Sequence, residues 1–320
     1  MNQNKEVILS MVSEGANLET ASYNELYLVK KLWEQNSFLP SIRVICNGPK
    51  TREYLELIEE LQSKNLKIIP VIEDTNELDF FSKYKGELGV RVDLDVKVTS
   101  HWDKKINRYG LTTDEVLKMK KIRNLSLIHY HVGSQVEHMH DLMTPLKKCF
   151  KIYAELKKHN PSLDTIDIGG GMPIPYDLQK RYGFEGLARK IIRFLQSKAD
   201  KNDIPHPNIV CEWGRFMVSP AQITIYKVIG EKKIIHGNAK KWQVINGSFM
   251  NDLPDTWTIH QRWHVVPVNH LNYSGRKLVR SWVAGSSCDS DDKYTANGTY
   301  VLLPNLEYLP EGEAQYIAFL

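Results

Sequence analysis

The amino-acid sequence predicts an α/β protein in which a (β/α)8 barrel of the TIM type, without its first strand, precedes a smaller β domain. Two patterns lead to this prediction. Up to about residue 218, short apolar runs alternate with amphipathic helical stretches, which is typical of parallel strands with helices outside them. After Pro220 the apolar residues recur at every second position, as in strands with one buried face. We therefore expect two domains, residues 1–218 and 219–320.

The barrel strands are predicted from seven apolar runs that helical patterns separate. Several of these runs end in glycine or a polar residue, where a (β/α)8 barrel carries its active-site loops. An open doubly wound sheet shows the same alternation, so periodicity alone leaves that architecture as an alternative. The seven runs are 17–22, 42–48, 67–73, 89–94, 125–133, 165–170 and 209–214.

The β domain is predicted from six further runs, and the two ends of the chain are unusual. The chain opens on a predicted helix, residues 4–11, where an eight-stranded barrel would have its first strand. Its last run is followed by no turn or helix. We therefore expect the sequence to be an internal fragment of a longer protein. The six runs are 222–229, 242–246, 264–269, 278–283, 300–303 and 315–320.

Composition and charge exclude several classes of protein. A chain of 320 residues that is 42% hydrophobic and 25% charged is neither disordered nor fibrous. The net charge of +4 is scattered along the chain, which argues against a nucleic-acid partner. No apolar run approaches the ~20 residues of a membrane span, and no signal peptide is present. The four cysteines lie far apart and the histidines lack metal-binding spacing, so we expect a soluble, cytoplasmic protein with neither disulfide nor metal.

Four motifs carry the functional prediction. They are HVGSQ at 131–135, DIGGG at 167–171, CEWGR at 211–215 and CDSDD at 288–292. The glycine turn at 169–171 would direct several N–H groups at one point with no Cβ in the way, as phosphate-binding turns do. Most glycine clusters are only tight or flexible turns, so the functional prediction depends on the combination of the four motifs and not on the glycines alone.

In this order the four motifs resemble those of the alanine-racemase-like (fold type III) decarboxylases of basic amino acids, which use pyridoxal 5'-phosphate. Within that family, Asn246–Phe249, Leu253–Trp257 and CDSDD are most similar to biosynthetic arginine decarboxylases. The resemblance implies decarboxylation of L-arginine to agmatine in polyamine biosynthesis. Ornithine, lysine or diaminopimelate remain alternative substrates, because one or two carboxylates can bind any distal cation. A non-catalytic homologue that acts as a binding or regulatory partner is the other alternative.

The resemblance assigns cofactor-binding roles residue by residue. Glu212 matches the carboxylate that keeps the cofactor's ring nitrogen protonated. His131 matches the imidazole that stacks on the ring, and Ser134 with Gly169, Gly170 and Gly171 matches the phosphate cup. Without the resemblance, Glu212 would be taken for a strand-end ion pair and His131 for a packed side chain, which is how we interpret His129.

Four more residues are assigned to the cofactor pocket by the same resemblance. Arg215 matches a cation that faces the phosphate, although Trp213 stands where the family usually has proline. Arg91 matches an arginine near the ring hydroxyl, and Glu19 and Glu25 match acidic residues that support the pocket. Each of these alone would be an ordinary charged residue.

The remaining assignments concern the substrate and the two ends of the chain. Cys288 and Asp289 resemble residues that homodimeric members contribute across the subunit interface, a buried thiol that protonates the α-carbon and a carboxylate that binds the distal cation. Asp291 is a second carboxylate that could bind a guanidinium. The alternative interpretation of the CDSDD motif is an acidic loop exposed to solvent, without a function in catalysis.

The family's Schiff-base lysine would lie just before Met1, since Lys5 falls in the first helix, and its Gly-Ala-Tyr segment would follow Leu320.

Overall fold

A computed structural model describes residues 2–35, 42–100, 108–176, 179, 181–269, 277–294, 299–306, 309 and 312–320. The chain divides into two compact units. The first consists of Met1–Ile174 and Arg181–Val218, and the second of Pro175–Lys180 and Ser219–Leu320. Among the helices described here, none has both the length and the apolar character needed to cross a membrane.

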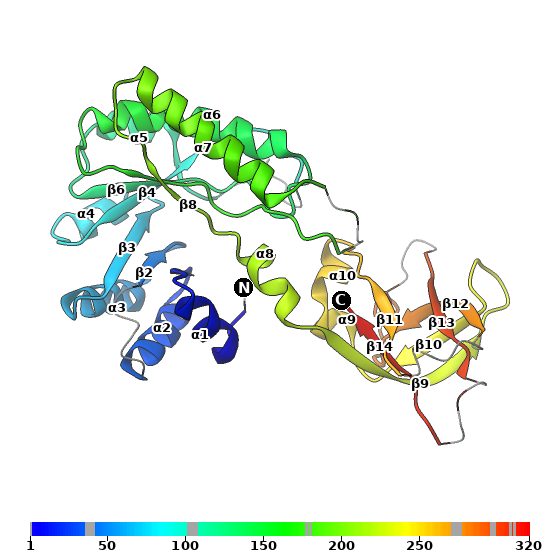
Figure 1. The fold of residues 1–320 in the computed structure, drawn as a ribbon. Coiled ribbons are helices and arrows are strands. Elements are labelled where there is room, and N and C mark those ends of the chain that lie inside the picture. Colours follow the sequence, from blue (N-terminus) through cyan, green and yellow to red (C-terminus); the bar gives the residue numbers. More distant parts are fainter. Residues whose placement is uncertain are drawn as a thin grey trace. The chain divides into compact units, whose positions relative to one another are not determined.

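The first unit is built on a parallel sheet whose strands follow one another in chain order (Figure 1). Sequential order is the order of a (β/α)8 barrel, whereas a doubly wound sheet rearranges its strands, so the doubly wound alternative is wrong. The path begins at β1 and ends at β8, neither of which pairs with a further strand in the described part of the chain. Its strands are β1 (Leu18–Thr20), β2 (Arg43–Cys46), β3 (Lys67–Ile72), β4 (Leu88–Asp93), β6 (Leu125–His129), β7 (Thr165–Asp167) and β8 (Asn208–Val210).

All seven predicted barrel strands are therefore confirmed, most of them shorter than predicted, while β4 keeps its predicted length and begins one residue earlier. One strand was not predicted, the two-residue β5 (Leu111–Thr112), which pairs with β4 outside the main path. Two residues are too few to produce a periodic pattern, so the sequence carried no signal for it.

Amphipathic helices fill the intervals between these strands. In α3 (Arg52–Ser63) the buried residues Tyr54, Leu57, Ile58 and Leu61 recur at helical spacing, which gives the helix one apolar face for the sheet. Asn4 caps the first helix through its side chain, as Thr51 caps α3. The other helices of the unit are α1 (Lys5–Ser13), α2 (Tyr23–Gln35), α4 (Glu77–Phe81), α5 (Thr113–Met119), α6 (Met139–Lys157), α7 (Phe184–Lys201) and α8 (Gly214–Val218).

The second unit contains a mixed sheet with the order β11-β14-β9-β10-β12-β13. Its pairs are antiparallel except β10 with β12. Tyr226, Ile245, Phe249 and Phe319 lie at the centre of its own apolar core. All six predicted runs fall on these strands, which are β9 (Thr224–Lys233), β10 (Lys241–Ile245), β11 (Val265–Pro267), β12 (Leu278–Ala284), β13 (Val301–Pro304) and β14 (Tyr316–Phe319).

Candidate active site

The candidate site is a polar layer on the inner face of the parallel sheet. Ile45, Val71 and Leu127, from three different strands, form a small apolar cluster with Val210 against it. Because successive side chains of a strand point to opposite faces, residues two positions further on share the face of this cluster. These residues, at the carboxyl ends of the strands, are Asn47, Glu73, His129 and Glu212.

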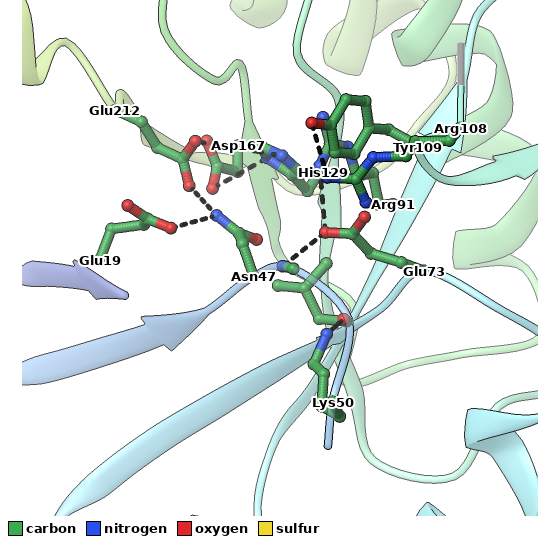
Figure 2. Close-up of polar contacts among 12 residues, drawn as sticks. Glu19, Asn47, Lys50, Glu73, Arg91, Arg108, Tyr109, His129, Asp167 and Glu212 are labelled. Atoms are coloured by element: carbon green, nitrogen blue, oxygen red, sulfur yellow. Dashed lines mark hydrogen bonds and ion pairs between the residues drawn. The ribbon is translucent and has the colours of Figure 1, made fainter. Parts of the chain in front are cut away.

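Asn47 links two of the carboxyl groups in this layer (Figure 2). Its Nδ2 donates to Glu212 Oε1 at 2.6 Å and to Glu19 Oε1 at 3.0 Å. Asn47 is buried, and only 11% of the Glu212 side chain is exposed. One amide group therefore fixes the orientation of Glu212 and connects β1, β2 and the loop after β8.

Asp167, at the end of β7, lies between His129 at the end of β6 and Glu212 after β8 (Figure 2). The Nδ1 of His129 is 3.2 Å from Asp167 Oδ2, and its Nε2 is 4.0 Å from Glu212 Oε2. The imidazole is 1% exposed and the Asp167 side chain is fully buried. The three side chains lie close enough for one cation, metallic or organic, to contact all of them. The expectation that the chain binds no metal stays a prediction.

The pKa values of these groups move in the directions that burial requires. Burial first, and then the charge of Asp167, raise the pKa of Glu212 to about 7. Burial likewise raises the pKa of Asp167 to about 7 and lowers that of His129 to about 4. Loss of hydration, followed by the charge of Glu212, raises the pKa of Glu19 to about 7, although this side chain is exposed on the edge strand and solvent screens part of the effect. The layer therefore contains more carboxyl groups than its positively charged side chains can neutralise.

A second group of charges lies on the β2, β3 and β4 side of the layer. Glu73 Oε1 accepts from the backbone N of Gly48 at 2.7 Å and from Arg91 NH1 at 3.0 Å. The guanidinium of Arg91 also lies over the ring of Tyr109, 4.6 Å from its centroid. Arg91 lines a small recess with Tyr109, Tyr130 and His131. The structure thus places Arg91 and His131 at the same recess, and their predicted roles toward a cofactor stay predictions.

Lys50 is buried beside this group. Its ammonium donates to the carbonyl of Val71 and lies 3.6 Å from Glu77 Oε2. None of its side chain is exposed, and burial lowers its pKa despite the two neighbouring acids Glu77 and Glu73. Lys50 was not predicted from the sequence, because a lysine in a loop gives no sign of burial.

The glycine turn lies against His131. Gly169 has φ +64°, and a Cβ there would lie 2.4 Å from the carbonyl oxygen of Tyr130. A Cβ on Gly170 would lie 2.7 Å from His131 Nε2, and one on Gly171, at φ +115°, would crowd Val136 and Gly133. Only glycine fits these positions without displacement of neighbouring atoms. The turn therefore presents bare backbone next to the imidazole of His131.

Three other predicted residues lie around this layer. Ser134 is half-buried in the loop after β6, two residues beyond Val132. Arg215 is half-buried in the first turn of α8, and the neighbouring Trp213 is buried with its ring edge-on to Phe184. Glu25 accepts from the backbone N of Ala21 through Oε2 at 2.7 Å and so caps the start of α2, while its predicted role beside the cofactor pocket stays a prediction.

The CDSDD motif belongs to the second unit. Cys288, Asp289 and Asp291 are exposed in this chain, so the expectation of a buried thiol is wrong for the single chain. Asp292 alone is buried, and its Oδ1 accepts from the backbone N of Phe249 at 2.8 Å. This contact fixes the loop and leaves the three preceding functional candidates on the surface.

Four residues of the layer were missed or underrated by the sequence analysis. Asn47, Glu73 and Asp167 received no role, and His129 was interpreted as a packed side chain. All four lie at the carboxyl end of a strand or one residue beyond it. That position is the signal that would have found them, and for Asn47, Glu73 and His129 an apolar residue two positions earlier adds to it.

Comparison with known proteins identifies the family of the chain. A family model described as pyridoxal-dependent decarboxylase, pyridoxal binding domain, matches residues 1–219. Biosynthetic arginine decarboxylase of Phocaeicola vulgatus is 29% identical over 257 residues, a match that covers 72% of this chain and 40% of that protein. The chain therefore spans about two fifths of the length of the curated relatives it matches. The family resemblance inferred from the motifs is confirmed.

Solved structures support the fold. Biosynthetic arginine decarboxylase of Campylobacter jejuni superposes with a TM-score of 0.78 at 19% identity, over 97% of this chain and 66% of that one. Lysine/ornithine decarboxylase of Vibrio vulnificus, solved with cadaverine, gives a TM-score of 0.76 at 21% identity, over 99% and 78% of the two chains. The predicted fold class, a TIM-type barrel followed by a β domain, is confirmed.

Proposed function

Because the chain belongs to the pyridoxal-dependent decarboxylases, we propose that it decarboxylates a basic amino acid with pyridoxal 5'-phosphate as cofactor and L-arginine as substrate. The observation that carries this proposal is the near-buried carboxyl group of Glu212, which Asn47 holds in place inside the matched domain. When bound, the cofactor supplies the electron sink that decarboxylation requires. Glu212 would hold the proton on its ring nitrogen through a charge-assisted hydrogen bond.

The residues present fit such a cofactor. The turn at Gly169–Gly171 offers backbone N–H groups without a Cβ in the way, as a phosphate cradle requires. His131 lies directly against Gly170, so its flat ring is available for stacking beside the cradle. Arg215, at the start of α8, would add a fixed positive charge for the phosphate.

The electrostatics of the layer also favour a cationic ring. Burial raises the pKa values of both Asp167 and Glu212, and the negative charge of Asp167 raises that of Glu212 further. A protonated ring nitrogen next to Glu212 would lower both pKa values and relieve that repulsion. The site is thus arranged to prefer the ring in its protonated form, the form that withdraws electrons best.

The substrate and assembly are the finer parts of the proposal. Arginine is favoured over ornithine, lysine and diaminopimelate by the curated relatives named arginine decarboxylases and by two carboxyl groups, Asp289 and Asp291, that could bind a guanidinium as a pair. A homodimer with shared active sites is supported by the exposure of Cys288 and Asp289. Ile225 and Ile229 on β9, 48% and 54% exposed, add apolar surface of the kind that assembly buries.

The test is to purify the 320-residue chain and, in parallel, the longest open reading frame that contains it. Cofactor binding is measured by absorbance, and release of labelled CO2 is measured with arginine, ornithine, lysine and diaminopimelate. We expect CO2 release with arginine at the highest kcat/KM from the longer product. Cofactor binding without CO2 release from any substrate would instead support the non-catalytic homologue, and no cofactor binding by either product would contradict the proposal.

A further inference from the structure

Lys50 and Glu77 are two enclosed charged residues that have no role in the proposed function. Lys50 follows β2 and Glu77 is the first residue of α4, close to Glu73 after β3 and to Arg91 on β4. None of the Lys50 side chain is exposed, and the other three side chains are 8–11% exposed. Buried charges are stable in a protein only when they are paired, and here each cation has an acid of its own.

Glu77 joins the loops that follow β2 and β3. Its Oε1 accepts from the backbone N of Lys50 at 3.3 Å, and its Oε2 accepts from the backbone N of Glu73 at 3.0 Å. The ammonium of Lys50 lies 3.6 Å from the same Oε2. The two oxygens of one carboxyl group thus hold two loops at the carboxyl edge of the sheet. An amide at this position would offer one acceptor oxygen in place of two.

Lys50 connects the same two strands at a point where their pairing has ended. The register of β2 with β3 runs as far as Cys46 and Pro70. Val71 is the next residue of β3, and its carbonyl oxygen accepts from the Lys50 ammonium. The lysine therefore extends the contact between β2 and β3 beyond the paired residues, and it keeps the loop after β2 against the sheet.

Glu73 links these contacts to Arg91. Its backbone N is held by Glu77, while its Oε1 accepts from the backbone N of Gly48 at 2.7 Å and from Arg91 NH1 at 3.0 Å (Figure 2). Arg91 and His131 line the same recess. A shift of either loop would therefore move the carboxyl group of Glu73, and with it the guanidinium at this recess.

We propose that Lys50 and Glu77 are positioning residues, which hold Glu73 so that it fixes the Arg91 guanidinium at the recess beside His131. Neither Lys50 nor Glu77 lines the recess itself, so both act through Glu73. The inference rests on the proposed function in that this recess adjoins the bound cofactor. It adds two residues of the β2 and α4 side of the sheet to those that determine how the cofactor is held.

The first test follows the reactivity of Arg91 in the cofactor-free protein. Phenylglyoxal modifies accessible guanidinium groups, and mass spectrometry gives the rate of modification for each arginine. We expect Arg91, which is 9% exposed and bound to Glu73, to react slowly in the wild type and several-fold faster in Lys50→Met and in Glu77→Ala. Arg189, which is 68% exposed on α7, serves as the reference arginine.

Lys30→Met is the matched control, because it also removes a lysine that pairs with a glutamate. Its ammonium lies 2.6 Å from Glu60, between α2 and α3, and its side chain is 17% exposed. We expect this variant to leave the reactivity of Arg91 at the wild-type rate. Glu77→Gln should give a rate between those of the wild type and Glu77→Ala, because the amide keeps one acceptor oxygen.

The second test determines whether Lys50 acts through Arg91. We expect Lys50→Met to raise the Kd of pyridoxal phosphate by roughly 10- to 100-fold, as is typical of residues that orient a ligand-holding group. In an Arg91→Met background the same substitution should change the Kd less than about twofold, because the effects of coupled residues do not add. A purely structural role would give the same change in both backgrounds.

Two results would overturn the inference. The first is a wild-type rate of Arg91 modification in folded Lys50→Met and Glu77→Ala. The second is an equal rise in Kd from Lys50→Met with and without Arg91. Absence of cofactor binding would contradict the proposed function alone, since the modification rates need no cofactor. If the single variants do not fold, the double variant Lys50→Met/Glu77→Gln, which leaves neither charge unpaired, takes their place in the modification test.

Discussion

The acidic side chains of the two units differ in what surrounds them. In the first unit, Asp167 and Glu212 are enclosed by the sheet and held by Gly169 and Asn47. In the second unit, the exposed Asp289 and Asp291 make local contacts, which include a hydrogen bond of 2.8 Å from Asp291 N to Asp289 Oδ1 and an ion pair of 3.5 Å between Asp291 and Lys293. The same residue type is therefore fully positioned in one unit and left open to solvent in the other.

Asp292 explains how the exposed acids stay in place. Its Oδ1 accepts from Phe249 N at 2.8 Å, its Oδ2 accepts from Ser287 N at 3.3 Å, and its carboxyl group is buried against Gly285. One buried acid thus anchors the loop to the apolar core of its unit. The difference between the regions teaches that burial and hydrogen bonds fix the acids of the first unit, whereas the exposed acids of the loop are positioned only through their buried neighbour Asp292 and local contacts.

The largest expected effect is that of Glu212→Gln, which tests the enclosed acids. The amide keeps the shape and can still accept from Asn47, but it cannot stabilise a protonated ring nitrogen. We expect turnover to fall on the order of 10³-fold while the cofactor stays bound. Glu185→Gln, which removes an exposed helical ion pair with Arg189, is the matched control and should leave turnover unchanged. A loss under about tenfold would remove Glu212 from its assigned role.

The next effect tests whether the exposed loop completes a neighbour's site. Cys288→Ala and Glu212→Gln chains are each expected to be nearly inactive. If every site combines Glu212 of one chain with Cys288 of the other, half of the randomly mixed dimers contain one intact site, and roughly one quarter of full activity returns. Activity is measured after the two chains are unfolded together and refolded. Mixtures no more active than either parent would show that each site is built within one chain.

A smaller effect distinguishes the buried acid of the loop from its exposed neighbours. Asp292→Ala leaves the buried N–H of Phe249 without its acceptor, so we expect a loss of about 1–3 kcal/mol in the free energy of unfolding. Asp291→Ala removes an exposed side chain and should cost less than about 0.5 kcal/mol. Thermal unfolding of both variants gives the comparison. Equal losses would mean that Asp292 does not anchor the loop.

The sequence predicted most of the fold because each strand needed only a local apolar run. It also assigned roles to Glu212, His131 and the glycine turn, because these belong to motifs with fixed spacing, and those roles stay predictions. Asn47, His129 and Asp167 were missed or underrated because their roles depend on which strands are neighbours. The parallel register that places His129 opposite Asp167 joins residues 38 positions apart, and no local pattern encodes that pairing. The exposure of Cys288 was missed for a similar reason, since burial of a thiol is decided by the packing around it.

The smallest expected effect concerns pH, and it tests whether the enclosed acids differ from ordinary surface carboxyl groups. Burial raises the pKa values of Asp167 and Glu212 to about 7, well above those in an unfolded chain. Between about pH 4.5 and 7 the folded state therefore binds more protons than the unfolded state, so these two groups make the protein less stable as the pH rises through this window. His129, with a pKa lowered to about 4, acts in the opposite direction below about pH 6.5, but it is one group against two.

We therefore expect the cofactor-free chain to be less stable at pH 8 than at pH 5.5, by on the order of 1 kcal/mol, or a fall of about 2–4 °C in Tm. Calorimetry at the two pH values measures the difference. Glu212→Gln should reduce this difference in stability between the two pH values, because one buried acid no longer has to ionise. Asp291→Asn, in the exposed loop, should leave the difference unchanged. Bound cofactor should also reverse the fall of stability with rising pH, since a cationic ring favours the ionised forms of the two acids. A stability that does not change between these pH values, or that changes equally in both variants, would show that the enclosed acids behave like the exposed ones.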